Sequence, residues 1–569
     1  MSAPPPLVFL LTPRLRLALQ TFGLSLTCQV KTNVSCPAAC FTADKLHYII
    51  FLQTCIETVG LQILYSKIGF TADFLQVISL KINKGRVNMQ SSIKLSTHLA
   101  SNIHLLKELL PIGTSFDLIT RNLYLRDTPA FFLGVNGFCK TDILQQIFSD
   151  LQNPLYTQNA TIEDLAHFMQ SKIGYAQVEL TSDMDKILKQ VLSGPVLLLV
   201  DGFDQGLLID VRTYPTRSVE EPDTEHVTRG SREGFVETML FNANLIRRHI
   251  RSTNLIFELA SVGTDSKTDI AITYLNNLAE KDQLTHIRKI LQNMNISALT
   301  MGAQSLSELL VHKKWYHPLP SIFMTERPDV ACSYLMEGYI LLIVDTSPCV
   351  LVLPSSFFQF TQSPEDYSSS PLVGGYFRIV RFLCIPISLF LMPVFFLLAA
   401  YFPQISTQMK LLQDSSIGPI RLFFYVTAVE FLLDLFKYSS SHVSNRFSGS
   451  LSIIGGLIIG DVAVSLNWAS TEVLFYAAIT LLTSLSLTSV EFSDGLRVLR
   501  IFLIFMTGFF RLPGFIIGTV LILTSIATTP TFAHVSYLWP LFPFNWAALK
   551  TLLFRYPTKK AQPGKVWRR

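Results

Sequence analysis

Acidic side chains inside apolar segments are the residues of this sequence best suited to chemistry in a membrane. In the apolar run from Ser450 to Val464, Gly456 and Gly460 are four residues apart and Asp461 follows directly. Small residues at this spacing let two helices approach closely, and an ionised carboxylate at membrane depth is costly unless it faces a protein interior or water. Asp461 therefore either faces such an interior or lies near the membrane surface beside a cation.

We expect the helix from Leu451 to Trp468 to line a conducting path, because its glycines leave little side-chain surface for lipid. A ring of apolar side chains around such a path can close it by dewetting. The pore candidates on this helix are Gly456, Leu457, Ile458, Ile459, Gly460 and Asp461. Glu430 and Asp434 are further candidates, since they share one helical face in the preceding apolar segment. Either they face a path, or a cation such as Lys437 pairs with one of them.

A second group of charges lies in the polar part of the chain, between Arg212 and Glu237. Prolines and glycines interrupt this stretch, which is typical of a loop ordered by arginine–carboxylate pairs. Such a loop either closes its own domain through internal ion pairs or contacts a neighbouring subunit. The candidate residues are Arg212, Arg217, Glu220, Glu221, Arg229, Arg232, Glu233 and Glu237.

Motifs of enzymes and metal sites are missing from the sequence. It has no GxxxxGK[ST], HExxH or GxSxG pattern, and its 8 cysteines form no CxxC pair. We therefore predict no catalytic residue, no metal site and no cofactor, and we expect the protein not to be an enzyme. Nothing in the charge pattern points to nucleic acid.

The distribution of charge divides the chain into two environments. The protein has 569 residues, of which 49% are hydrophobic and 15% charged, with a mean hydropathy of +0.38. The charges gather between about Lys94 and Glu365, and apolar runs of spanning length follow. We predict an extension of unknown role (1–92), a soluble domain (93–370), a polytopic helical membrane domain (371–550) and a basic tail (551–569).

The soluble region is predicted to be α+β. Two β-hairpins are indicated by apolar runs around short polar turns, at 196–210 and 339–353. Between them, 234–251 has an apolar helical face and ends in arginines, which suit a helix C-terminus. The region forms either one domain or two subdomains that meet near Gly263 to Asp269.

Five apolar segments must be helical, because backbone groups in lipid have no water to bind. They are Phe382–Phe402, Ile420–Phe436, Leu451–Trp468, Val473–Leu487 and Val498–Thr528. Arg511 and Pro513 interrupt the last, which is either one kinked helix or two half-helices. Flanking cations, among them Arg497 and Arg500, fall on one side if the number of crossings is even. We favour four crossings plus a re-entrant hairpin, or six, with both termini in the cytoplasm.

Long irregular strings carry a resemblance to a known family. The chain resembles the GerA family of bacterial spore germination proteins, and within it the stage V sporulation protein AF branch, in one order from about Lys94 to Lys550. The strings include Arg212-Thr-Tyr-Pro-Thr-Arg-Ser-Val-Glu-Glu-Pro-Asp, Arg229-Gly-Ser-Arg-Glu-Gly-Phe-Val-Glu-Thr, Asn244-Leu-Ile-Arg-Arg-His-Ile-Arg, Thr325-Glu-Arg-Pro-Asp-Val and Val344-Asp-Thr-Ser-Pro. Residues 1–92 precede the usual start of the family, and Arg511 stands where the family is typically uncharged.

The resemblance implies a multi-pass protein of the spore inner membrane whose soluble domain faces the spore core. It also implies a ring-shaped homo-oligomer that conducts monovalent cations early in germination. The implied partners are membrane lipid, the B-type subunits of germinant receptors and the products of the dipicolinate-channel operon. A non-conducting scaffold for germinant receptors and an accessory role in dipicolinate release remain as alternatives.

Overall fold

The computed structural model describes residues 93–125, 128–152, 165, 177–213, 225, 227, 229–311, 316–409, 411–412, 417–442, 464–465, 470–532 and 535–554. These residues belong to the second of two compact units, Ser91–Arg569. The extension predicted at 1–92 lies outside the described residues, and so does the predicted basic tail beyond residue 554. Of the segment from Leu451 to Trp468, which is predicted to be helical, only residues 464 and 465 are described.

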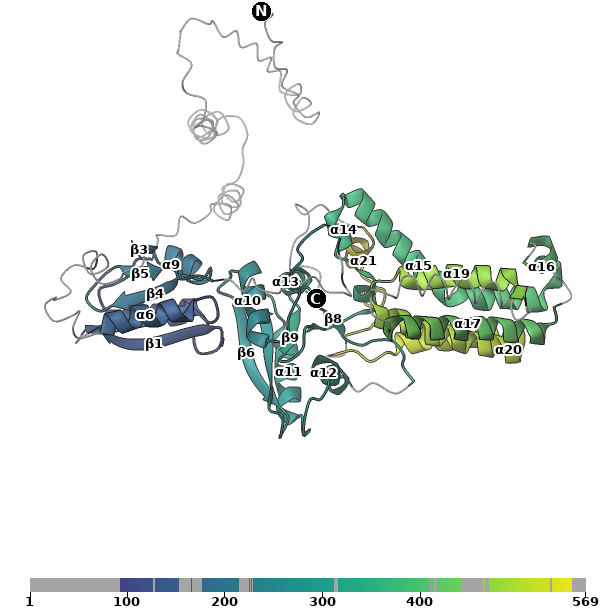
Figure 1. Ribbon diagram of the computed structural model, residues 1–569, viewed down its shortest axis with the longest axis horizontal. Helices are drawn as coiled ribbons and strands as arrows, with labels where there is room; N and C mark the ends of the chain where they lie inside the picture. The colour runs from purple at the N-terminus through teal and green to yellow at the C-terminus, as the bar shows by residue number, and fades with distance from the viewer. Residues whose placement is uncertain are drawn as a thin grey trace, which may run out of the picture. The chain divides into compact units, whose positions relative to one another are not determined.

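The soluble region contains two antiparallel sheets of five strands (Figure 1). The strand order is β1-β2-β4-β5-β3 in the first and β6-β7-β9-β10-β8 in the second, so the two sheets share one topology. The strands of the first are β1 (Leu118–Leu125), β2 (Thr128–Val135), β3 (Val178–Thr181), β4 (Val196–Val200) and β5 (Gly206–Ile209). Those of the second are β6 (Leu255–Val262), β7 (Thr268–Leu275), β8 (Phe323–Thr325), β9 (Ile340–Val344) and β10 (Val350–Leu353). Both predicted hairpins are confirmed, as β4–β5 and β9–β10.

Helices cover both faces of each sheet, because the central strands are buried on both sides. On the first sheet, α5 and α9 contribute to one core and α6 to the other; on the second, α10 and α13 face one core and α11 and α12 the other. The helices are α5 (Leu99–Leu109), α6 (Thr141–Gln152), α9 (Met184–Val191), α10 (Met239–His249), α11 (Lys281–Asn293), α12 (Ala303–Leu310) and α13 (Pro328–Glu337). The α+β prediction with two subdomains is therefore confirmed, but their predicted meeting point near Gly263 to Asp269 is wrong: that stretch connects β6 to β7 within the second sheet, and the change of sheet falls between β5 and β6.

Helix α10 begins five residues later than the sequence predicts. The amide side chain of Asn242 bonds both the backbone N–H and the carbonyl of Val236, at 2.8 and 2.5 Å, and holds the preceding chain away from the helix. The last turn contains Arg247, Arg248 and His249, in agreement with the expected cationic C-terminus.

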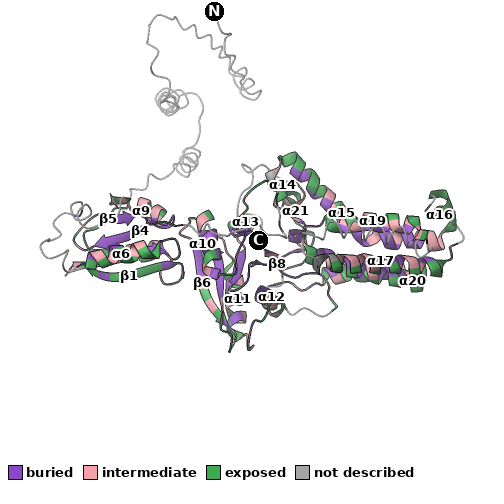
Figure 2. Ribbon diagram, viewed as in Figure 1, coloured by how far each residue is buried: buried purple, intermediate pink, exposed green. Residues whose placement is uncertain are grey.

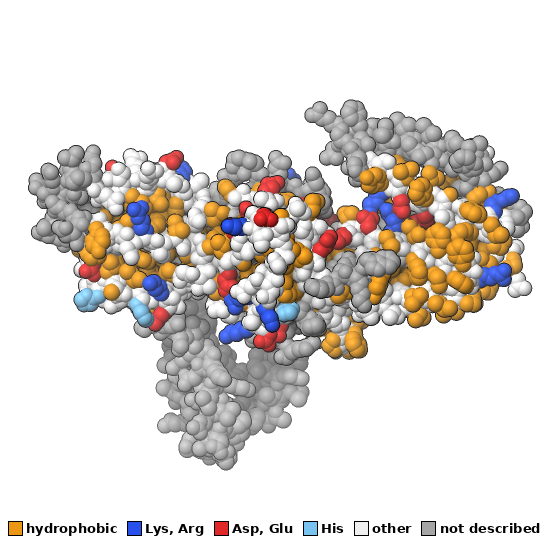
Figure 3. Space-filling model, turned by 90° about the horizontal axis from the view of Figure 1, so that it is seen from below, with side chains coloured by type: hydrophobic (Ala, Val, Ile, Leu, Met, Phe, Trp, Pro, Cys, Tyr) orange, Lys and Arg blue, Asp and Glu red, His pale blue; other side chains and the backbone are white. Residues whose placement is uncertain are grey.

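The C-terminal region is helical and apolar. Its elements are η2 (Phe357–Thr361), α14 (Glu365–Ser368), α15 (Pro371–Tyr401), α16 (Pro403–Met409), α17 (Pro419–His442), α19 (Thr471–Leu485), α20 (Val490–Ala527) and α21 (Trp546–Leu553). Among the described residues, α15 and α20 are long and apolar enough to cross a membrane, with mean hydropathies of 2.5 and 1.9. Helices α15, α17, α19 and α20 pack together, and we call them the bundle. Figure 3 shows hydrophobic side chains over most of its visible surface.

Helix α20 is two half-helices that fold back on each other. Arg511 interrupts it with φ 55° and ψ −138°. A Cβ atom on Gly518 would lie 2.7 Å from Leu503, so the second half packs against the first. Gly495 near one end lies against Pro318 and Leu319, and Ser525 near the other end lies 3.4 Å from His317. Both ends of this hairpin therefore contact the soluble region, and the half-helix alternative is the correct one.

A common aromatic core joins the hairpin to the second sheet. Phe492 of α20 stacks on Phe360 at 5.8 Å between ring centroids and meets Phe357 edge-on at 5.2 Å. Tyr537, which follows the hairpin, is fully buried beside the same two rings. Because these rings lie in one continuous cluster with α10 and α13, a displacement of the second sheet would be transmitted to α20 through direct packing.

Candidate functional site

Three ion pairs connect α17 to the first half of α20, and we call them the charge ladder. The first is Glu430–Arg500, the second Asp434–Arg497 and the third Lys437–Asp494. Residues three or four apart share one face of a helix. The three ladder residues of α17 therefore form one row, and the three of α20 form a second row that faces it. The residue numbers rise on α17 as they fall on α20, which shows that the two helices run antiparallel.

The Glu430–Arg500 pair is the most buried part of the ladder. Arg500 Nε and Nη2 donate to the two carboxylate oxygens of Glu430 at 3.0 and 2.8 Å, and Nη1 donates to the carbonyl of Ser388 in α15 at 2.9 Å. The side chains are 3% and 4% exposed. Arg500 lies ten residues from either end of the first half-helix, or about 15 Å along its axis. The pair thus joins three helices near the middle of the bundle.

The other two pairs are more open and less well aligned. Arg497 Nη1 approaches Asp434 Oδ1 to 2.8 Å, yet within the described part of the chain neither that oxygen nor Arg497 Nε has a partner with hydrogen-bond geometry. Asp434 is 31% exposed and Asp494 48% exposed. Ion pairs exposed to this degree contribute little to stability. The ladder therefore weakens from the middle of the bundle towards the soluble region.

The ladder shows what the sequence prediction missed. Glu430 and Asp434 do share a face, but their partners are Arg500 and Arg497, and Lys437 binds Asp494 instead. Hydropathy predicts that the last segment begins at Val498, which would make both arginines flanking cations. The helix in fact begins at Val490, where the Ser489 side chain accepts from the Phe492 N–H. The repeat Asp494-xx-Arg497-xx-Arg500 is the signal that could have identified them.

The predicted pore residues Gly456, Leu457, Ile458, Ile459, Gly460 and Asp461 lie outside the described residues. Their role remains a prediction. Of the described acids in the bundle, Glu430 and Asp434 each face an arginine. Chemically, the ladder holds helices together through matched charges and presents no excess of negative charge.

The described part of the Arg212–Glu237 loop is tied to its own soluble region. Arg327 is fully buried and donates to the carbonyls of Glu225 and Ser231 at 3.0 and 2.8 Å. Glu233 accepts from Arg248 at 2.9 Å and lies 3.3 Å from His249. These contacts agree with the interpretation that the loop closes the domain.

The remaining loop candidates are distributed between local contacts and the surface. Arg212 pairs with Asp210, with Nε 2.7 Å from the carboxylate. Arg229, Arg232 and Glu237 are exposed. Arg217, Glu220 and Glu221 lie outside the described residues. A subunit contact made by this loop remains a prediction.

Glu225 is a loop residue that the sequence analysis missed. Its carboxylate accepts from Thr325 Oγ1 at 2.8 Å and from the Glu326 N–H at 3.2 Å. Burial raises the pKa of Glu225 from 4.5 to about 7, against the lowering effect of these hydrogen bonds. The attachment of the loop therefore contains a group that titrates near neutral pH.

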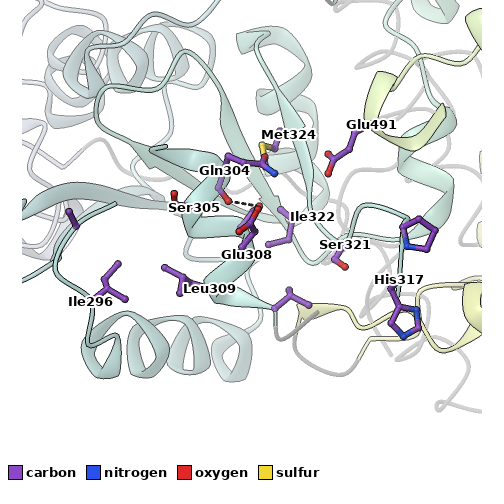
Figure 4. Close-up of a pocket in the computed structure, with 14 residues that line it drawn as sticks. Ile296, Gln304, Ser305, Glu308, Leu309, His317, Ser321, Ile322, Met324 and Glu491 are labelled. Atoms are coloured by element: carbon purple, nitrogen blue, oxygen red, sulfur yellow. Dashed lines mark hydrogen bonds between the residues drawn. The ribbon is translucent and has the colours of Figure 1, made fainter. Parts of the chain in front are cut away.

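A cavity of about 800 Å³ lies between α12, the chain before β8 and the start of α20 (Figure 4). Glu308, His317 and Glu491 line it, together with Ser321, whose buried Oγ has no hydrogen-bond partner. Glu491 brings the start of the α20 hairpin into the wall of the cavity, so a movement of that end would change its shape. Among the described residues, no three His, Cys, Asp or Glu side chains are grouped to hold a metal ion.

A comparison with family models identifies the chain. Residues 105–564 match the model described as Bacillus/Clostridium GerA spore germination protein. The chain belongs to the GerA family. The match covers most of the stretch over which the resemblance was predicted, and the family assignment is thereby confirmed.

Named relatives of the chain match more than four fifths of its length. Stage V sporulation protein AF of Bacillus subtilis is 31% identical over 84% of this chain and 97% of its own length. Spore germination proteins KA and B1 of the same organism are 28% and 27% identical, over 82% of this chain and 86% and 96% of theirs. The N-terminal domain of the A subunit of the Bacillus megaterium spore germinant receptor GerK3 is 24% identical, with a TM-score of 0.35, over 46% of this chain and 97% of that one.

Proposed function

We propose that this protein is a subunit of an oligomeric, ring-shaped cation channel of the spore inner membrane that acts early in germination. Its relatives are named as sporulation and spore germination proteins. The observation that carries the proposal is the apolar bundle, in which α15 is long and apolar enough to cross a membrane and both ends of the α20 hairpin contact the soluble region. The buried Glu430–Arg500 pair holds this bundle together, as expected of ionisable groups inside membrane segments, which face a protein interior. The role we infer is not enzymatic.

In this proposal the charge ladder fixes the position of α17 and does not itself conduct ions, since its acids already face cations. The path is lined by the helix from Leu451 to Trp468, where Leu457, Ile458 and Ile459 form an apolar gate and Asp461 attracts cations at its mouth. The aromatic packing of Phe492 on Phe360 supports a route for the gating signal from the soluble region into the hairpin.

Ion flux in reconstituted liposomes, with and without co-purified partners, tests the channel. Asp461→Asn is expected to alter conductance or cation selectivity while the oligomer stays intact, and Gly456→Leu is expected to disrupt assembly. Asp265→Asn, an exposed acid of the soluble region, is the matched control for loss of one charge. Unchanged flux and selectivity in both Asp461→Asn and Asp461→Lys would move the path to another helix.

We propose that both termini face the spore core. Arg378 and Arg381 at the start of α15 and the basic tail support this orientation, whereas Arg497 and Arg500 lie inside the bundle and do not bear on it. The contact of both hairpin ends with the soluble region also supports it. Cysteine labelling at positions 94 and 565 in sealed vesicles tests it. Labelling of the two positions from opposite faces would contradict the proposal.

We also propose that the exposed end of the Arg212–Glu237 loop contacts a neighbouring subunit. Arg229 and Arg232 lie at the surface, while the buried end of the loop is held by Arg327. Replacing either exposed arginine with Ala should weaken oligomerisation, measured by light scattering of the purified protein. Normal assembly together with loss of small-molecule binding would make the loop a ligand site instead.

A non-conducting scaffold for germination receptors is the second candidate, and the matched charges of the ladder favour it. A scaffold needs no excess of acid along a membrane path, and it would bind the same germination membrane proteins as partners. Absence of flux under all conditions, combined with retained binding to receptor B-type subunits, would support the scaffold. Flux of dipicolinate in preference to cations would support a part in its release.

A further inference from the structure

Large apolar side chains are exposed around the first turns of α15 and beside α21, and we call this surface the collar. Leu372 is 82% exposed, Phe542 73% and Trp546 59%. Figure 2 shows the exposed side of these first turns, and Figure 1 shows α14 and α21 beside them. The members of the collar are Tyr367, Leu372, Tyr376, Phe377, Leu541, Phe542, Phe544 and Trp546.

A buried arginine holds the two parts of the collar together. Arg378 of α15 donates from Nη1 to the carbonyls of Thr551 and Leu552 at 3.3 Å, so its charge sits at the C-terminal end of α21. Its Nε donates to Asp366 of α14 at 2.8 Å, and its guanidinium lies 5.2 Å from the ring centre of Tyr367. The exposed side chains therefore belong to a fixed platform.

The length of α15 places this platform at one end of the bundle. The helix has 31 residues, or about 46 Å at 1.5 Å per residue, whereas the hydrocarbon core of a bilayer is about 30 Å thick. Its far end is fixed beside the tip of the hairpin, because Tyr401 donates to the carbonyl of Gly508 at 3.2 Å. The excess length is therefore at the start, where the collar lies.

We propose that the collar inserts into the interface between headgroups and acyl chains of the leaflet nearest the soluble region. Tyr and Trp prefer this layer because their rings are apolar and their N–H or O–H groups reach water. The collar continues the apolar surface of a helix that itself suits the membrane, and exposed Lys550 of α21 adds a cation that suits anionic headgroups. An apolar surface of this kind is a liability in water.

Quenching of Trp546 fluorescence tests the proposal in the full-length protein. The protein is reconstituted in vesicles of phosphatidylethanolamine and phosphatidylglycerol, with bromine either near the headgroup end of the acyl chains or near their middle. The contribution of Trp546 is the difference between the parent protein and Trp546→Phe. We expect a loss of that emission with both brominated lipids, larger for the shallow bromine. Equal emission in brominated and unbrominated vesicles would overturn the proposal.

A second variant separates lipid from a protein partner. In the double variant F542D/F544D, the quenching of Trp546 should fall, whereas Phe241→Asp, an exposed aromatic of α10, should leave it unchanged. Size-exclusion chromatography confirms that each variant is folded. If Trp546 is instead shielded by a second copy or a partner, its emission will not respond to brominated lipid in any variant, and the proposal fails.

Discussion

The soluble region and the bundle each contain a buried arginine–carboxylate pair, and the two regions differ in what lies beside that pair. In the soluble region, Arg247 donates to Asp117 at 2.7 Å and to the carbonyls of Ser252 and Leu255 at 2.9 Å, and Asp117 also accepts from Ser115. In the bundle, Arg500 likewise donates to both carboxylate oxygens of Glu430 and to the carbonyl and hydroxyl of Ser388, but the neighbouring Asp434–Arg497 pair is misaligned.

The contrast between one buried pair in the soluble region and a ladder of pairs in the bundle indicates that ion pairs serve two purposes in this protein. Asp117 precedes the first sheet and Arg247 lies in the helix before the second, so their saturated pair fixes the two subdomains to each other. In the bundle, satisfaction declines along the ladder towards the soluble region. We infer that the deep pair is permanent and that the outer pairs are those able to separate when α17 or the hairpin moves.

The largest effect is expected at the deep pair. Arg500→Ala leaves Glu430 buried without a partner, which should cost about 3–5 kcal/mol, whereas E430L/R500L removes both charges and should recover most of that loss. Thermal unfolding of the detergent-solubilised protein measures both variants. If the single and double variants were equally destabilised, the pair would not be the source of the effect.

The second effect tests the saturated pair of the soluble region. Asp117→Asn keeps one acceptor oxygen but removes the charge that balances Arg247, so a loss of about 1–3 kcal/mol is expected. This loss in the free energy of unfolding is measured by chemical denaturation, with the fluorescence of the soluble region as the signal. Asp210→Asn, in the partly exposed pair with Arg212, is the matched control and should cost less; an equal cost would remove the distinction between buried and exposed pairs.

The third effect depends on pH and belongs to the soluble region. Burial raises the pKa of Glu225 to about 7 from 4.5, so between these values the folded protein keeps a proton that the unfolded chain releases. Stability should therefore fall as the pH rises from about 5 to 8, by an amount on the order of 1 kcal/mol. Burial also raises the pKa of Glu337 to about 7, so Glu225→Gln should make this dependence shallower without removing it, whereas exposed Glu237→Gln should leave it unchanged; an equal decline in both variants would contradict the assignment.

The sequence predicts those parts of the fold that local pattern determines. The β4–β5 and β9–β10 hairpins follow from apolar runs around polar turns, and the break at Arg511 from a charge and a proline inside an apolar helix. The partners of Glu430 and Asp434 could not be predicted in this way. They depend on the antiparallel packing of two helices far apart in the sequence, and on a helix start at Val490 that hydropathy alone places too late.

The smallest effect is expected at Asp434, and it decides whether the ladder truly weakens towards the soluble region. The carboxylate is 31% exposed, and its contact with Arg497 lacks hydrogen-bond geometry, so Asp434→Asn should cost less than about 1 kcal/mol. Arg497 keeps a second acid, Asp494, at 3.9 Å, which limits the loss further. Thermal unfolding beside Arg500→Ala measures the contrast under one condition. A loss as large as that of Arg500→Ala would mean that the outer pairs hold the helices as firmly as the deep one, and the proposed moving part would have to lie elsewhere.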